Sequence, residues 1–206
     1  MYEKFGAVFH ADPFATDAIA SSSLSTHDAD LIELLRVYGG NSFDNGLYRV
    51  IRADEVLHWS ELIGRAFPAF NERITCFSMD WLGRVFAVDV ARTVEERPGV
   101  VMFEPGTGEA LEIPCNLESF HESELIEYRD AALAEAFHRQ WLAGGGSSPG
   151  RDQCIGYKKL LFLGGEDKIS NLEVSDLDVY WTIAAQLIRK TQELAQGASI
   201  GKVFVA

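Results

Sequence analysis

The stretch ITCFSMDWLGRVFAVDVARTVEERPGVVMFEPGTGEALEI, residues 74–113, decides the fold class. It holds short runs rich in β-branched and aromatic residues, the composition of strands: Ile74–Met79, Arg84–Val90, Val100–Phe103 and Glu109–Ile113. Turn signals separate the runs: Trp81-Leu82-Gly83, Arg97-Pro98-Gly99 and Pro105-Gly106-Thr107-Gly108. Connections this short join antiparallel neighbours, so the stretch predicts an antiparallel meander. Glu112, between Leu111 and Ile113, indicates that one face of the sheet meets water.

Helical patterns lie on both sides of this meander. Before it, a helix is predicted from Thr26 to Tyr38, a strand over Leu47–Ile51, and a second helix capped by Asp54. After it, helical spacing covers Glu118–Leu142 and Ser175–Gln196. Helices, then a sheet, then helices predict an α+β fold, an antiparallel β-sheet meander flanked by helices. Alternating βαβ units are not indicated, which argues against a Rossmann-type nucleotide fold.

One flexible-looking linker, residues 144–150 (GGGSSPG), precedes the last part of the chain. An apolar run, Leu160–Leu163, and the final helix follow it. A segment with one strand and one helix is too small for its own core, so we expect it to dock onto the sheet. The predicted organisation is an N-terminal region with the central hairpins, residues 1–115, and a C-terminal region, residues 116–206, docked on the same sheet as one compact unit.

The composition favours a protein-binding role over nucleic-acid or membrane binding. The 206 residues include 18 basic and 31 acidic ones, a net charge of −13. Such a surface repels nucleic acid and membranes and attracts a basic protein partner, although it also serves solubility alone. Cys76, Cys115 and Cys154 are widely spaced, which predicts buried free thiols without a disulfide framework or zinc site. No apolar run reaches about 18 residues, and the first residues lack a signal-peptide pattern, so we expect a cytoplasmic protein.

Motifs for catalysis, metal or phosphate binding do not reach the required spacing. The stretch GYKKLLFLGGED, residues 156–167, lacks the Lys-Ser/Thr step of a phosphate loop and the acid ladder of a calcium loop. The stretch that starts at His121-Glu122 begins like the zinc motif H-E-x-x-H, but Leu125 occupies the position of the second histidine. The histidines are predicted to be helix-surface or capping residues. We therefore expect no catalytic residues, no metal and no cofactor.

An alternative stays open beside the binding role. Acids occur in pairs, and four tryptophans are available: Trp59, Trp81, Trp141 and Trp181. A small-ligand-binding or hydrolytic protein could use a cleft of carboxylates and aromatic rings. A deep pocket with convergent acids would favour that alternative, and a shallow acidic face would favour a protein partner.

Two segments resemble a known protein family. Residues 28–51, DADLIELLRVYGGNSFDNGLYRVI, are similar to the helix, glycine turn and strand of the GAD-like domain at the N-terminus of bacterial type VI secretion immunity proteins. Residues 153–165, QCIGYKKLLFLGG, with Asn171-Leu-Glu-Val and the Trp181 helix ending Ala-Ala-Gln-Leu187, resemble the C-terminal domain of the same proteins. The central hairpins fit the broader SMI1/KNR4-like immunity folds.

The resemblance implies a protein that binds and neutralises a co-encoded toxin, expected to be a nuclease, without catalysing a reaction. An acidic protein is steered to the basic surface of a nuclease and can occlude it. Trp81, at a hairpin tip, is the predicted anchor, because interfaces favour tryptophan; packing beneath the helices is its alternative. Partner contacts are predicted at Asp80, Trp81, Asp89, Glu104, Glu166 and Asp167.

Overall fold

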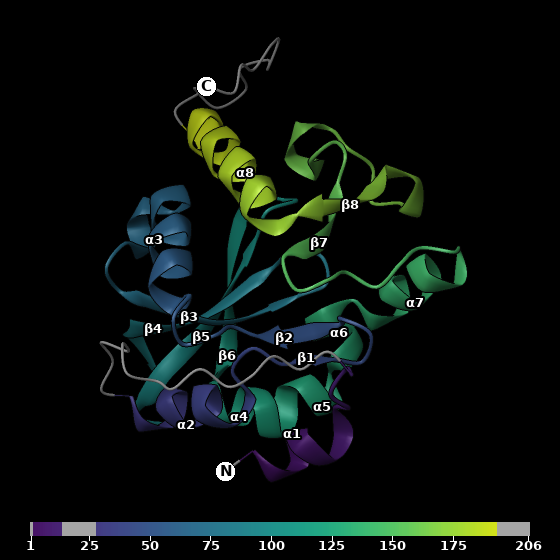
Figure 1. Cartoon of the computed structure of the whole chain (residues 1–206). Coiled ribbons are helices and arrows are strands. Elements are labelled where there is room, and N and C mark those ends of the chain that lie inside the picture. Colours follow the sequence, from purple (N-terminus) through teal and green to yellow (C-terminus); the bar gives the residue numbers. More distant parts are fainter. Residues whose placement is uncertain (1, 14–27, 193–206) are drawn as a thin grey trace.

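The computed structural model describes residues 2–13 and 28–192. Six strands form one antiparallel sheet in sequence order, β1 to β6 (Figure 1). They are β1 Ser42–Phe43, β2 Tyr48–Val50, β3 Ile74–Asp80, β4 Val85–Val94, β5 Arg97–Glu104 and β6 Glu109–Asn116. The predicted meander is confirmed, and two further strands extend it on the N-terminal side.

Helices cover both faces of the sheet, as Figure 1 shows. On one face lie α1 Glu3–Val8, α2 Ala29–Tyr38, α4 Leu117–Ser119 and α5 Leu125–Glu127, and on the other lie α3 Val56–Ala66 and α8 Leu177–Gln192. The remaining elements are the π-helical turn η2 Phe120–Glu124, α6 Arg129–Leu133, α7 Glu135–Ala143, and the short 3₁₀ turns η1 Pro68–Phe70, η3 Leu161–Leu163 and η4 Ile169–Asn171. The α+β prediction is confirmed. None of the described helices has the length and apolar character needed to span a membrane.

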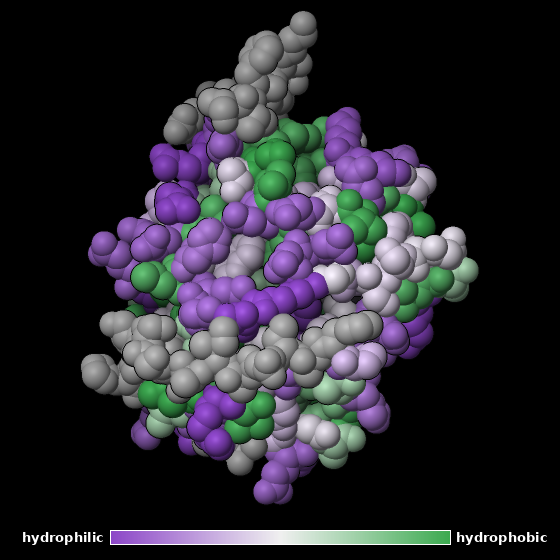
Figure 2. Space-filling view, viewed as in Figure 1, coloured by the Kyte–Doolittle hydropathy of each residue, from purple (hydrophilic) through white to green (hydrophobic). Residues whose placement is uncertain are grey.

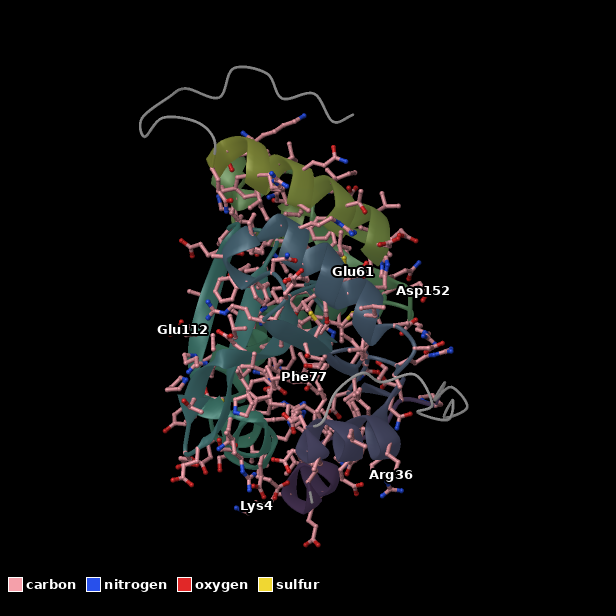
Figure 3. All side chains as sticks on the ribbon, turned by 90° about the vertical axis from the view of Figure 1, so that its left-hand side faces the viewer. Lys4, Arg36, Glu61, Phe77, Glu112 and Asp152 are labelled. Carbon is pink, nitrogen blue, oxygen red and sulfur yellow. The ribbon has the colours of Figure 1, made fainter. Side chains whose placement is uncertain are left out.

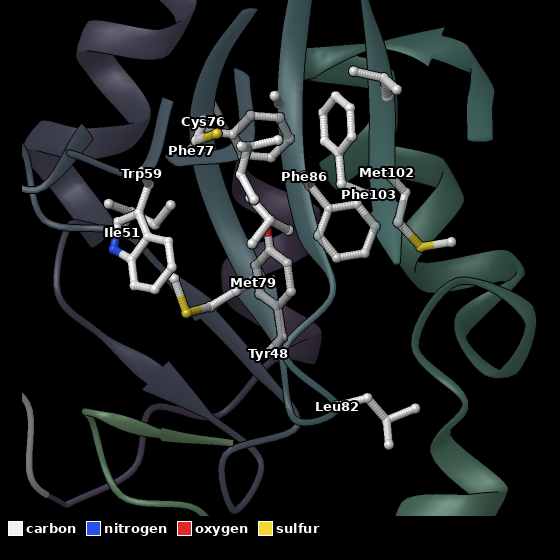
Figure 4. Close-up of a cluster of buried hydrophobic side chains, with 14 of the residues drawn as sticks. Tyr48, Ile51, Trp59, Cys76, Phe77, Met79, Leu82, Phe86, Met102 and Phe103 are labelled. Carbon is white, nitrogen blue, oxygen red and sulfur yellow. The ribbon is translucent and has the colours of Figure 1, made fainter. Parts of the chain in front are cut away.

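Sequence alternation in the strands explains why both faces need covering. In β2, Tyr48 bonds to His121 on one face, whereas the guanidinium of the next residue, Arg49, bonds to Gly150 and Arg151. Successive strand side chains point to opposite faces, so these neighbours serve two separate layers. Figure 4 shows core side chains carried by adjacent strands, and in Figure 3 Phe77 lies deep between the layers. The three cysteines are buried and free, as predicted.

The helical spacing predicted over residues 118–142 corresponds to several short helices in the structure. Ala134 adopts a left-handed backbone, with φ of 51°, and separates α6 from α7. The apolar run Leu160–Leu163 is also no strand, because Leu161–Leu163 forms a 3₁₀ turn that ends at Gly164, with φ of 82°. The strands of this region are β7 Gln153–Tyr157 and β8 Leu172–Asp176, which pair with each other in a separate two-stranded sheet.

The C-terminal region packs against the hairpin turns of the main sheet. The Ile155 amide donates to the Trp81 carbonyl over 2.7 Å, and the Trp181 indole N–H donates to the Gly83 carbonyl over 2.7 Å. The Phe162 amide donates to the Gly106 carbonyl over 3.2 Å. These bonds place β7, η3 and α8 over the turns that connect β3 to β4 and β5 to β6.

Candidate functional site

Trp81, the predicted anchor, lies in the interior. Its side chain is fully buried, its indole N–H donates to the Leu133 carbonyl over 2.9 Å, and its ring contacts Phe137 and His138. The hairpin tip that carries it is covered by the C-terminal region through the Ile155 bond. The prediction of a surface contact at Trp81 is therefore wrong, and its alternative, packing beneath the helices, holds.

Asp80 and Asp89 are internal ion-pair partners instead of surface acids. Neither carboxylate is exposed. Asp80 bonds to the Arg84 guanidinium and accepts the backbone amides of Leu82 and Arg84, and Asp89 pairs with Arg73. A buried carboxylate is costly unless such donors compensate it. The two acids thus stabilise the β3–β4 region and offer nothing to a partner in this conformation.

Glu104, Glu166 and Asp167 remain predicted partner contacts. Glu166 and Asp167 are exposed, with Glu166 3.2 Å from the Lys168 amine and Asp167 accepting the Tyr157 hydroxyl over 2.7 Å. Glu104 is half-buried at the end of β5, and burial raises its pKa. Burial raises the pKa of Tyr157, and the negative charges of Asp167 and Glu104 raise it further.

A pocket of about 810 Å³ opens where the N-terminal and C-terminal regions meet. The main sheet contributes Val50 and Met79, α3 contributes Trp59, and the first turn of α8 contributes Leu177. Residues 148–152, within and just after the predicted linker, form another wall. The predicted linker therefore contributes to the wall of this pocket. Figure 2 shows the face onto which the pocket opens, where hydrophilic residues crowd between α3 and α8.

Arg49 holds the linker wall to the sheet. Its Nη1 donates to the carbonyls of Gly150, over 2.8 Å, and Arg151, over 2.6 Å. The side chain is 5% exposed, and its Nε and Nη2 have no hydrogen-bond partner within the described residues. Burial lowers the pKa of Arg49, because desolvation penalises its charged form. An arginine inside a predicted strand was the available sequence signal for this role, and sequence reasoning missed it.

Acidic side chains dominate the edge of the pocket. Five carboxylates line it, against the guanidinium groups of two arginines and one imidazole: Asp12, Glu55, Asp152, Asp176 and Asp178. The carboxylate of Asp12 is already hydrogen-bonded within this chain. It accepts from the Ser42 hydroxyl and from the amides of Asn45 and Gly46, in the turn that follows β1. Glu55 pairs with Arg151 across the pocket wall.

The other three acids, Asp152, Asp176 and Asp178, we call the acidic rim; they come from β7, β8 and α8 or the residues next to them. Asp152 is 82% exposed at its side chain, and its backbone carbonyl accepts the amide of Leu177, the first residue of α8. Asp178 lies 3.0 Å from the His58 imidazole of α3. The carboxylate of Asp176 accepts the Val179 amide over 2.9 Å. Exposed carboxylates beside the apolar side chains of the pocket suit a group that carries both positive charge and apolar surface.

Two histidines are interior residues, contrary to the predicted surface or capping positions. His121 is fully buried, with Nδ1 donating to the Leu117 carbonyl and Nε2 accepting from the Tyr48 hydroxyl over 2.8 Å. His138 is 2% exposed and contacts Trp81. Burial lowers the pKa of both, that of His121 to about 4. Within residues 2–13 and 28–192, no cluster of three or more His, Cys, Asp or Glu side chains could hold a metal ion.

Residues 116–188 match the family model described as the C-terminal domain of the type VI secretion (T6SS) immunity protein Tdi1. The resemblance to type VI secretion immunity proteins is thereby confirmed, whereas the GAD-like and SMI1/KNR4-like assignments stay predictions. The crystal structure of Atu4351 from Agrobacterium tumefaciens is similar, with a TM-score of 0.57 and 13% identity over 90% of this chain and 89% of that chain. At this identity the likeness shows the α+β fold alone. No curated protein sequence matches the chain.

Proposed function

We propose that this chain, whose residues 116–188 are similar to the C-terminal domain of the T6SS immunity protein Tdi1, is an immunity protein that binds and neutralises a cognate type VI toxin. The family-model match carries the proposal. The matched region includes most of α8 and the strands β7 and β8 that contribute the acidic rim. An immunity protein of this kind acts by binding and needs no catalytic residue.

The charge of the chain supports a basic toxin, and a nuclease is the expected kind. Net charge is −13, and a nuclease needs a basic surface to hold phosphate groups. Opposite surface potentials accelerate association and help to set the register of the complex. Occlusion of that basic surface is the proposed mode of inhibition.

A second candidate function follows from the volume of the pocket. At about 810 Å³, it lies within the range of small-molecule sites, and it combines carboxylates with the Trp59 ring. A small-ligand-binding protein remains the alternative on that observation. Thermal unfolding against a panel of cationic metabolites tests it, because a ligand that fills the pocket raises the Tm of the purified protein.

Co-expression with the toxin encoded by the adjacent gene tests the main proposal. We expect the toxin alone to arrest growth, co-expression of this chain to restore it, and the two proteins to co-purify. A basic toxin domain should bind more weakly as salt rises, since steering between exposed charges is screened. Persistent growth arrest together with the absence of a complex would exclude the immunity function.

A further inference from the structure

We propose that the pocket between α3, α8 and residues 148–152 is the docking site for the toxin, and that its occupant is a toxin segment presenting a lysine or arginine beside an apolar side chain. The inference rests on the proposed immunity function and adds the surface that performs it. It replaces the hairpin tip at Trp81, which the structure buries.

Charge favours a basic side chain at the rim of the pocket. Asp152, Asp176 and Asp178 belong to a segment of 27 residues, numbers 152–178, that folds so that all three line one opening. Asp152 and Asp178 have side chains 82% and 58% exposed, so a partner can reach them without moving the core. A lysine or arginine placed there pairs with these carboxylates, although Asp152 also lies 3.6 Å from the Arg151 guanidinium and Asp178 lies 3.0 Å from the His58 imidazole.

Apolar surface continues from the pocket onto α8. Val179 lines the pocket and is 56% exposed, and Ile183, one helical turn further along, is 39% exposed. Figure 2 shows hydrophobic atoms above the hydrophilic band, over α8. An apolar centre beside charged groups is the usual anatomy of a protein interface. The occupant therefore has to bury an apolar side chain as well as carry positive charge.

Arg49 determines where in the pocket the positive charge and the apolar side chain of the occupant can lie. Its buried guanidinium lines the pocket, and the hydrogen bonds it makes among the described residues go to the backbone carbonyls of Gly150 and Arg151. The positive charge at the floor repels a cation that enters deeply, so the basic group of the occupant belongs at the acidic rim. Nε and Nη2 of Arg49 are buried and have no acceptor in the part of the chain that the structure describes.

Neutralising the acidic rim tests the proposal. The variant Asp152→Asn, Asp176→Asn, Asp178→Asn keeps side-chain shape and leaves an acceptor for the Val179 amide. Its affinity for the toxin encoded by the adjacent gene is measured by calorimetry, with thermal unfolding as a check of folding. We expect a loss of roughly tenfold or more, with a weaker salt dependence than the unmodified protein shows.

A matched control separates the pocket from overall charge. Glu3→Gln, Glu109→Gln, Glu127→Gln makes the same change in net charge at exposed residues that do not line the pocket. We expect this control to bind within about twofold of the unmodified protein, because long-range charge alone acts mainly on association rate. Equal losses in both variants would overturn the pocket while leaving the immunity function intact. If the unmodified protein does not bind the toxin, the immunity function itself fails.

A second pair of variants tests the apolar half. Val179→Ser should weaken toxin binding by roughly fivefold or more, since apolar contact area is lost at the interface centre. Val90→Ser makes the same substitution at a residue 64% exposed on β4, outside the pocket, and should leave affinity unchanged. Equal binding by both variants, or a small molecule found bound in the purified pocket, contradicts a toxin segment as its occupant.

Discussion

At the residue scale, buried polar side chains hold the interior together through specific partners. Asp80 with Arg84 and Asp89 with Arg73 are ion pairs that the sequence displays only as scattered charges. Strand alternation predicted that Asp80 and Trp81 lie at the end of a hairpin arm, but not that a later segment covers them. Their burial depends on contacts with residues more than 50 positions away, such as Leu133, which local pattern does not encode.

Trp81→Phe should lower stability and leave toxin binding intact. The substitution removes the indole N–H and leaves the Leu133 carbonyl without its donor, which costs about 1–3 kcal/mol. Urea unfolding measures this loss, and calorimetry measures binding. Unchanged stability with a sharp loss of affinity would contradict this account and would show that Trp81 contacts the toxin.

His121 should make the protein less stable as the pH falls. Its pKa is lowered from 6.5 to about 4 by burial, so between those values the unfolded chain takes up a proton that the folded protein does not. The contribution is fully present above pH 6.5, and about 3 kcal/mol is lost by pH 4. Unfolding free energies from pH 7 to pH 4, compared with those of His121→Gln, isolate it. Parallel pH profiles for the two proteins would contradict this account.

At the element scale, tertiary contacts decide where helices break and which turns need glycine. The helical spacing over Glu118–Leu142 is present, yet the structure interrupts it at η2, at Tyr128 and at Ala134. Helix propensity does not predict these breaks, because tertiary context overrides it. Gly83, in contrast, was predictable: a glycine between two predicted strands indicates a turn. Its φ of 76° lies in the left-handed region that favours glycine and confirms that turn.

Gly83→Ala should destabilise the protein more than Gly145→Ala. Both glycines have positive φ, 76° and 87°, where a Cβ atom costs about 1–2 kcal/mol. At Gly83 the added atom also lies 3.2 Å from Cys154 and 3.3 Å from Leu177, whereas at Gly145 nothing among the described residues lies within 4 Å. Chemical unfolding of both variants gives the difference, which measures how tightly β7 and α8 pack on the hairpin. Equal losses would mean that this packing is loose.

At the scale of the whole molecule, the pocket is built by residues far apart in the chain. Arg49 comes from the N-terminal region, and Gly150 and Asp178 come from the C-terminal region. The sequence predicted both regions and the acidic character of the surface. It could not predict the pocket, because residues 144–150 have the composition of a free linker, whereas in the structure the carbonyl of Gly150 accepts a hydrogen bond from the buried Arg49.

The C-terminal region, residues 116–206, should not fold as a separate unit. Its Trp181 indole donates to the Gly83 carbonyl and its Ile155 amide donates to the Trp81 carbonyl, both in the turn between β3 and β4. Without the sheet, those groups and the apolar face of α8 meet water. Circular dichroism of the isolated fragment should show no cooperative thermal transition, whereas residues 1–206 should show one. A cooperative transition in the fragment would establish two independent domains.

The central claim is that the acidic rim and the apolar side of α8 bind the toxin. Growth of cells that express the toxin from the adjacent gene, with this chain or its rim variant, tests that claim most directly. The account predicts full protection by the unmodified protein and by the Glu3, Glu109, Glu127 control, and reduced protection by the Asp152, Asp176, Asp178 variant. Equal protection by both variants would contradict the docking site, and no protection by the unmodified protein would contradict the immunity function.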